Sequence, residues 1–185
     1  MLTLDLERRA SRIAHDGTTI TGRAIVFGSL SEDLGGFREI IEPSAVDRTF
    51  TEGIDVRALV DHEPGKIIGR LSAGTLALEK RNDGLHVRIV PPDTTVGRDI
   101  LESVKRGDVT GMSFTFGVVR PGGDRFEQRA DGLVRYVSDM RIREVSLVTF
   151  PAYESTDASV AQRSVQAFQR EHGQRIDWLR RRLVA

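Results

Sequence analysis

The chain has 185 residues, which is enough for one domain to bury a core without disulfides or metals. Its 27 basic and 27 acidic side chains balance, so nothing in the overall charge favours binding to nucleic acid. The absence of cysteine excludes disulfides, cysteine-ligated zinc and cysteine nucleophiles. No apolar run approaches the roughly 20 residues of a membrane-spanning helix, and residues 1–17 lack the apolar segment of a signal peptide. We therefore expect a soluble intracellular protein.

The first half of the chain predicts short strands joined by turns. Residues 20–28 are apolar at adjacent positions, which is typical of a strand buried on both faces. Residues 56–60 predict a strand that ends at the turn cluster 61–65, so His62 is expected at the tip of a hairpin or at a strand end. Residues 75–90 predict a second hairpin, because an Asn-Asp-Gly turn joins two apolar-rich strands.

The second half predicts a helix, more strands and a helical end. Residues 93–107 combine a capping side chain, an apolar stripe and a terminal glycine, which favours a helix. A strand is expected at 112–118, a polar loop or flap at 120–132, and a strand that bends near its middle at 133–150. Residues 159–185 predict an arginine-rich amphipathic helix. Many short strands with few helices predict a mainly β fold with helices (α+β), arranged as an antiparallel barrel or a sandwich.

The strand at 112–118 carries the first candidate for chemistry. Bulky apolar side chains alternate there with small ones, so one face is apolar and the other is bare around Ser113. A serine hydroxyl is a weak nucleophile unless a base accepts its proton, and imidazole is the usual base. Among histidines 15, 62, 86 and 172, the one at 62 ranks first, because a hairpin tip can project its ring into a cleft. Taken singly, a serine in such a strand is more often a small residue on the solvent face, and a histidine before such a turn is more often a turn residue than a base.

Three motifs in combination resemble a known family. They are a histidine before a turn in residues 60–71, Gly-Met-Ser-Phe in residues 107–118, and Glu-Val-Ser followed by Pro-Ala in residues 143–159. Together with residues 20–50 they resemble the prohead proteases of tailed phages. These are capsid-maturation serine proteases that are related in fold to the herpesvirus assemblins. The resemblance covers about residues 21–159, and it implies an assemblin-type antiparallel β-barrel and peptide hydrolysis.

The resemblance also implies roles for particular residues. Ser113 matches the nucleophile and His62 matches the general base. The assemblins use a second histidine as the third residue, but the only histidine after Ser113 is His172, which lies outside the matched region. Glu144 holds the corresponding place in the chain order and would orient the imidazole. Asp61 is its competitor, although a direct neighbour of His62 points away from it in a regular strand.

Further expectations concern organisation and partners. We expect a protease domain at residues 1–158 and an arginine-rich helix or tail at 159–185. By resemblance, the substrates are the scaffolding segment of the major capsid protein and the protease itself. The protein would act inside the procapsid in the host or bacterial cytoplasm, and it could form a homodimer. No cofactor, metal, nucleic acid or membrane partner is expected. The amides near Met112–Phe114 or Arg141–Arg143 are the candidates for an oxyanion hole.

Two alternatives remain open from the sequence. The first is a catalytically inactive scaffold or capsid-binding barrel with the same fold. The second is an esterase or acyltransferase that uses the same serine and histidine. This second alternative is weakened because Thr115 occupies the position of the second glycine in the Gly-x-Ser-x-Gly pattern of such hydrolases.

Overall fold

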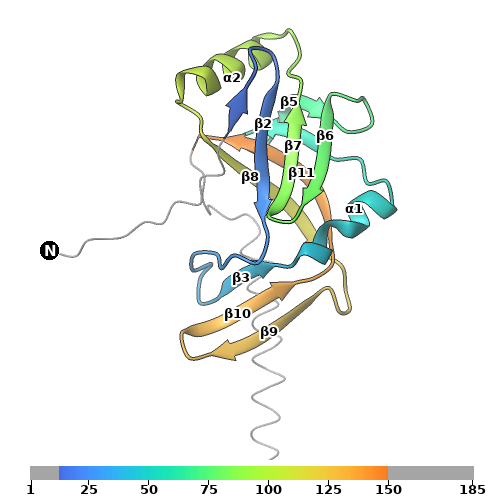
Figure 1. The fold of residues 1–185 in the computed structure, drawn as a ribbon, viewed down its shortest axis with the longest axis vertical. Coiled ribbons are helices and arrows are strands. Elements are labelled where there is room, and N and C mark those ends of the chain that lie inside the picture. The colour runs from blue at the N-terminus through green and yellow to red at the C-terminus, as the bar shows by residue number, and fades with distance from the viewer. Residues whose placement is uncertain (1–12, 150–185) are drawn as a thin grey trace, which may run out of the picture.

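Eleven short strands dominate the part of the chain that the structure, a computed structural model, describes, namely residues 13–149 (Figure 1). The strands are β1 (Ala14–His15), β2 (Ile20–Val26), β3 (Arg38–Ile41), β4 (Arg57–Val60), β5 (Glu63–Arg70), β6 (Leu76–Arg81), β7 (Gly84–Ile89), β8 (Gly111–Val118), β9 (Asp124–Arg129), β10 (Gly132–Val137) and β11 (Met140–Val148). The helical elements are the 3₁₀ turn η1 (Pro43–Val46) and the helices α1 (Asp47–Thr51) and α2 (Thr95–Arg106). The prediction of a mainly β fold with helices is confirmed.

These strands form three sheets. The hydrogen-bonded orders are β1-β2-β7-β6, β5-β4-β11-β8 and β3-β10-β9. The pairs β4/β11 and β3/β10 are parallel, and the other ladders are antiparallel. β2 packs beside β8 without a hydrogen-bonded ladder between them. The strands within residues 13–149 therefore do not close into the predicted barrel, and they are not all antiparallel.

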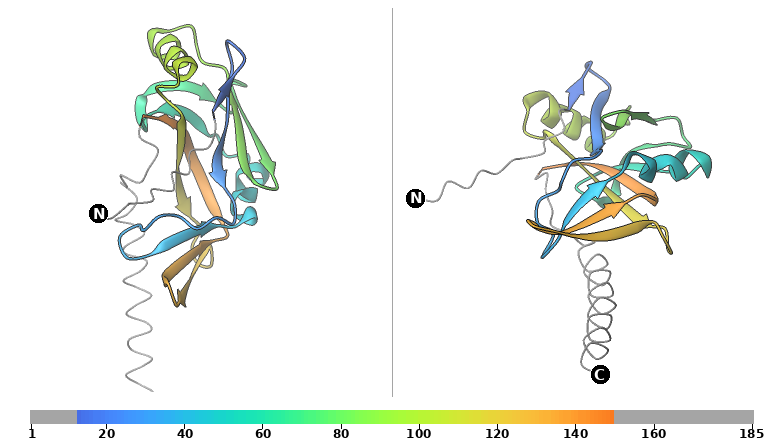
Figure 2. Two further views of the ribbon diagram at one scale, coloured as in Figure 1. Left: turned by 60° about the vertical axis from the view of Figure 1, so that its left-hand side comes forward. Right: turned by 60° about the horizontal axis from the view of Figure 1, so that its bottom comes forward.

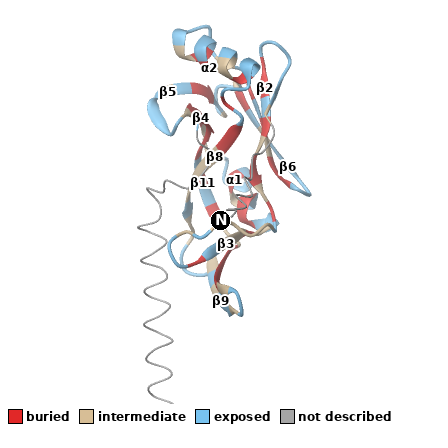
Figure 3. Cartoon of the chain, turned by 90° about the vertical axis from the view of Figure 1, so that its left-hand side faces the viewer, coloured by how far each residue is buried: buried red, intermediate tan, exposed pale blue. Residues whose placement is uncertain are grey.

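One core lies between the first two sheets. Its side chains come from the inner face of each sheet, and Figure 3 shows buried positions on the strands of both sheets. The most deeply buried members include Ile20, Ile25, Leu85 and Ile89 from the first sheet and Ala58, Ile68, Val145 and Leu147 from the second. Because successive side chains of a strand alternate between faces, this core fixes which residues of the second sheet lie on its opposite face.

The helix α2 precedes the serine strand and has the predicted limits. The Thr94 hydroxyl caps its first turn by accepting a hydrogen bond from the Gly97 amide at 3.2 Å. Gly107, with φ of 80°, adopts the left-handed conformation that ends the helix. Ile100 and Val104 are buried on one face of the helix. Figures 1 and 2 place α2 at the opposite end of the described region from the β3-β10-β9 sheet.

The polar segment 120–132 differs from its prediction as a loop. Residues Asp124–Arg129 form β9, which pairs with β10 along its whole length. Its one large apolar side chain, Phe126, packs edge-on against Phe37 with ring centroids 6.2 Å apart. The other side chains of β9 are polar or charged, as is common in strands at the edge of a sheet. The predicted C-terminal helix at 159–185 lies outside the described residues.

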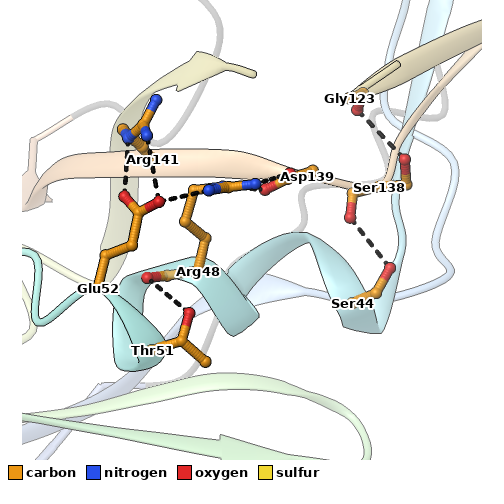
Figure 4. A network of polar contacts seen from close by, with 8 residues as sticks. All are labelled: Ser44, Arg48, Thr51, Glu52, Gly123, Ser138, Asp139 and Arg141. Carbon is orange, nitrogen blue, oxygen red and sulfur yellow. Dashed lines mark hydrogen bonds and ion pairs between the residues drawn. The ribbon is translucent and has the colours of Figure 1, made fainter. Parts of the chain in front are cut away.

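The long segment 133–150 bends between β10 and β11, as predicted. Polar contacts tie this bend to α1 (Figure 4). Arg48 donates a hydrogen bond from Nε to Oδ1 of Asp139 at 2.7 Å, and it also pairs with Glu52. Glu52 in turn accepts hydrogen bonds from Arg141 at 3.1 and 3.2 Å. The first residues of β11 are thus anchored before the strand reaches Glu144.

Candidate active site

His62 lies in a tight turn between β4 and β5. Only Asp61 and His62 separate the two strands, since Val60 pairs directly with Glu63, so the turn is shorter than predicted. Asp61 and His62 have φ of 48° and 58°. Positive φ at both central residues is what a two-residue type I′ hairpin turn requires, and Asp and His adopt it more readily than most residues. The Asp61 amide donates to the Leu147 carbonyl at 2.9 Å, which binds the turn to β11.

Glu144 of β11 contacts the imidazole of His62. Nδ1 of His62 lies 2.7 Å from Oε1 of Glu144. An ionised carboxylate can only accept a hydrogen bond, so His62 donates from Nδ1. In the neutral imidazole the lone pair is then on Nε2. This is the tautomer that a general base needs if the carboxylate is to orient the ring from behind.

The charge of Glu144 is stabilised by its hydrogen bonds. The residue is only 8% exposed, and burial by itself raises the pKa of the carboxyl group. Hydrogen bonds from His62, Ser146 and Thr115 outweigh the burial, so the pKa of Glu144 lies below its ordinary value. The carboxylate is therefore ionised at neutral pH and is able to stabilise an imidazolium ion.

A β-bulge directs Glu144 to the face on which the imidazole lies. The register between β11 and β8 shifts after Ile142, so that Ile142 pairs with Phe116 while Glu144 pairs with Thr115. Arg143 is the extra residue. Without the bulge, Ile142 and Glu144 would point to the same face, which is the core. The bulge lets Ile142 remain fully buried while Glu144 faces the opposite side.

Ser113 lies on this same face of the sheet. It pairs with Ser146 across the β8/β11 ladder, and its neighbour on the same face, Thr115, pairs with Glu144. Paired residues of adjacent strands project to the same side. The Thr115 hydroxyl lies 3.5 Å from Nδ1 of His62. The structure thus gathers Ser113, Thr115, Glu144 and the ring of His62 on one face.

The opposite face of β8 is apolar, as predicted. Phe114 and Phe116 stack with ring centroids 5.3 Å apart and pack against the core. Met112 is buried in the core beside them. On the serine face, a Cβ added at Gly117 would meet no atom within 4 Å. The face of β8 that carries Ser113 was expected to hold only small side chains. It is open near Gly117, toward the C-terminal end of the strand.

The structure separates the other candidates from this site. The carboxylate of Asp61 accepts hydrogen bonds from the Thr149 amide at 2.8 Å and from its hydroxyl at 3.1 Å, so it serves the turn and β11. His86 lies on β7 of the first sheet, where its Nε2 is 2.9 Å from Asp83. His15 is exposed in β1, and His172 lies outside the described residues.

Sequence reasoning missed two hydroxyl groups of the site, those of Thr115 and Ser146. Ser146 donates to Oε2 of Glu144 at 2.6 Å and accepts from the backbone amide of His62 at 3.2 Å. Both residues carried a signal. Thr115 follows Ser113 by two residues, and Ser146 follows Glu144 by two, so each shares a strand face with a candidate residue.

A comparison with protein families identifies the family of the chain. The sequence matches the family described as caudovirus prohead serine protease over residues 4–171. The chain belongs to this family, which supports a serine peptidase of phage prohead maturation acting on a capsid protein. No curated protein and no solved structure matches the chain. Within residues 13–149, no helix is both long and apolar enough to span a membrane.

Proposed function

We propose that the chain is a capsid-maturation serine endopeptidase in which Ser113 is the nucleophile, His62 the general base and Glu144 the residue that orients the base. The observation that carries this proposal is the contact of 2.7 Å between His62 and Glu144 on the sheet face that holds Ser113. The family supplies the reaction class, and the contact supplies a base that is oriented for it.

The pairing of β8 with β11 supports the proposal that the His62 imidazole reaches the Ser113 hydroxyl. Directly paired residues have Cβ atoms about 5 Å apart, and Ser113 is paired with Ser146. The hydroxyl of Ser146 is bonded to the His62 amide, so the histidine backbone is already next to this pair. The proposal requires the side chains of Ser113 and His62 to bridge the distance that remains between them.

The proposed reaction is peptide hydrolysis through an acyl-enzyme. Nε2 of His62 accepts the proton of Ser113 as Oγ attacks the peptide carbonyl, and the resulting imidazolium is stabilised by Glu144. The imidazolium then gives this proton to the leaving amine, and water releases the acyl group by the same steps. Acid and base assistance of this kind typically contributes about 10²–10⁴-fold to the rate.

The biological setting follows from the family. The substrates would be the scaffolding segment of the major capsid protein and the protease itself, cut inside the procapsid after assembly. Pairing into a homodimer belongs to the same proposal and is supported by the family resemblance alone.

Co-expression with the capsid precursor tests the function. We expect the intact mass of the precursor to shift to a shorter product with the parent protease and to remain unchanged with Ser113→Ala. Ser103→Ala is the matched control, because this serine lies on α2, where its hydroxyl bonds to the Asp99 carbonyl. Cleavage that persists in Ser113→Ala would exclude the nucleophile. A parent that leaves the precursor intact would favour the inactive scaffold.

A further inference from the structure

Ser146 makes a closed set of hydrogen bonds with His62 and Glu144. Its hydroxyl has one proton, and the His62 amide can only donate, so the hydroxyl accepts from the amide and gives its own proton to Oε2 of Glu144. The other carboxylate oxygen, Oε1, accepts from Nδ1 of His62. The hydrogen bonds therefore run from the His62 backbone amide through Ser146 and Glu144 to the His62 ring. Both carboxylate oxygens of Glu144 accept a hydrogen bond.

The burial of Ser146 makes the loss of its hydrogen bonds energetically costly. Ser146 is 0% exposed, and its two bonds run to a backbone amide in a strained turn and to a buried carboxylate. Hydrogen bonds to a charged group are about twice as strong as neutral ones, and a buried polar group without partners is costly. A small apolar residue would fill the same place in the strand, so packing alone does not require a hydroxyl there.

The turn at Asp61 and His62 needs a hydrogen-bond acceptor that holds its backbone. His62 has φ of 58°, a conformation that non-glycine residues adopt only where the surroundings hold it. The Asp61 amide is held by a backbone carbonyl, whereas the His62 amide is held by the hydroxyl of Ser146. The orientation of the histidine backbone thus depends on a side chain two residues from Glu144.

We propose that Ser146 is a positioning residue of the active site, whose hydroxyl couples the His62 turn to the Glu144 carboxylate and so holds the imidazole in line with Ser113. This inference rests on the proposed function for its effect on chemistry. The hydrogen-bond coupling itself does not depend on that function, and the two are separable by experiment.

The test compares Ser146→Val with Ser146→Thr. Valine and threonine have nearly the same shape, so both variants add similar volume to the buried site, and only threonine keeps a hydroxyl. The first readout is the labelling of Ser113 by a fluorophosphonate over a range of reagent concentrations. In Ser146→Val we expect the limiting labelling rate to fall about tenfold to a hundredfold with little change in the half-saturating concentration. In Ser146→Thr we expect the rate to stay within about threefold of the parent.

The second readout does not need a reactive serine. The Glu144 carboxyl carbon can be titrated by NMR in each variant. Loss of the Ser146 hydrogen bond should raise the pKa of Glu144 in Ser146→Val, while Ser146→Thr should leave it near that of the parent. A parent that is not labelled at Ser113 would refute the proposed function and leave the titration to decide the role of Ser146. Equal labelling rates and equal titrations in the two variants would overturn the positioning role, whatever their melting temperatures.

Discussion

Two buried carboxylate clusters in the described part of this molecule pair with different basic side chains. In the active site, Glu144 is paired with His62. In the β3-β10-β9 sheet, the Arg135 side chain is 4% exposed, and its guanidinium lies 3.0 Å from Glu39 and 2.9 Å from Asp124. Both clusters join strands that are distant in sequence, and both satisfy their carboxylates with charged or polar donors.

The two clusters differ in whether the basic side chain can release and regain a proton. An arginine side chain keeps its proton at every accessible pH, so the Arg135 cluster has one charge state and can only hold the strands together. A histidine gains and loses a proton near neutral pH, so the same kind of pairing at Glu144 supports proton transfer. The active-site cluster is also more open, because the His62 side chain is 40% exposed. A fixed ion cluster stabilises the fold, and a titratable one at the surface can serve a reaction.

The largest expected effect comes from Glu144→Gln. The amide keeps the shape of the side chain but loses the charge, and it no longer selects the tautomer with the proton on Nδ1. We expect the rate of precursor cleavage to fall by about 10³- to 10⁴-fold, as for the corresponding change in serine-protease triads. The rate is measured by following the intact mass of the product over time.

Asp61→Asn is the matched control for this change. It makes the same carboxylate-to-amide replacement one residue from His62, and asparagine still accepts from Thr149 and tolerates positive φ. We expect its cleavage rate to stay close to that of the parent. A large loss in Asp61→Asn with a normal rate in Glu144→Gln would exchange the roles of the two carboxylates.

The next effect is on stability rather than rate. Arg135→Met removes the guanidinium that Glu39 and Asp124 share, although Asp124 keeps its pair with Arg120. Breaking a buried ion pair costs about 3–5 kcal/mol. We expect the free energy of unfolding in urea to fall by this order, while the labelling rate of Ser113 in the folded protein is unchanged. Arg98→Met is the control, because its pair with Asp93 is exposed. Equal stability of the two variants would show that the Arg135 cluster does not hold the sheet.

A smaller effect is expected from Asp61→Val. A β-branched side chain is disfavoured at φ of 48°, and strain of this kind costs roughly 1–3 kcal/mol. Unfolding in urea should show this loss relative to Asp61→Asn, which accommodates the turn. If Asp61→Val is as stable as Asp61→Asn, the turn is not the constraint on His62 that the backbone geometry indicates.

The smallest effect is the pH dependence contributed by Glu144. Its pKa is lowered in the folded protein, so its ionised form adds stability above the unfolded value of about 4.3. That contribution is lost as the pH falls through the lower folded pKa. Urea unfolding between pH 5 and pH 3 should therefore lose stability more steeply in the parent than in Glu144→Gln. Parallel curves for the two proteins would contradict the lowered pKa.

Local patterns predicted most of the elements but not their arrangement in three open sheets. The helix α2 and the β6/β7 hairpin follow from caps, turn residues and apolar periodicity, all of which act within a few residues. The strand β9 was missed because five of its six side chains are polar or charged, and its pairing with β10 decides its structure. The parallel pairings of β3 and β4 depend on long-range packing, which no local pattern records.

The candidate site was predictable only in part, because long-range strand pairing decides which side chains meet. Strand alternation singled out Ser113 and the turn position singled out His62, whereas the resemblance supplied Glu144 and the role of each residue. The structure brings His62 to Glu144. Simple alternation along β11 would have sent Glu144 into the core with Ile142, because the bulge at Arg143 leaves no clear mark in the sequence. Strand parity alone places Thr115 beside Ser113 and Ser146 beside Glu144, but only the pairing of β8 with β11 shows that these residues share one face of the sheet.

The most direct test of the account is fluorophosphonate labelling of the parent and of His62→Ala, with the modified residue identified by peptide mass mapping. The account predicts one adduct per chain, on Ser113, and a labelling rate at least about 10²-fold lower in His62→Ala. An adduct on another residue, or equal labelling of Ser113 in both proteins, would contradict the claim that His62 activates Ser113.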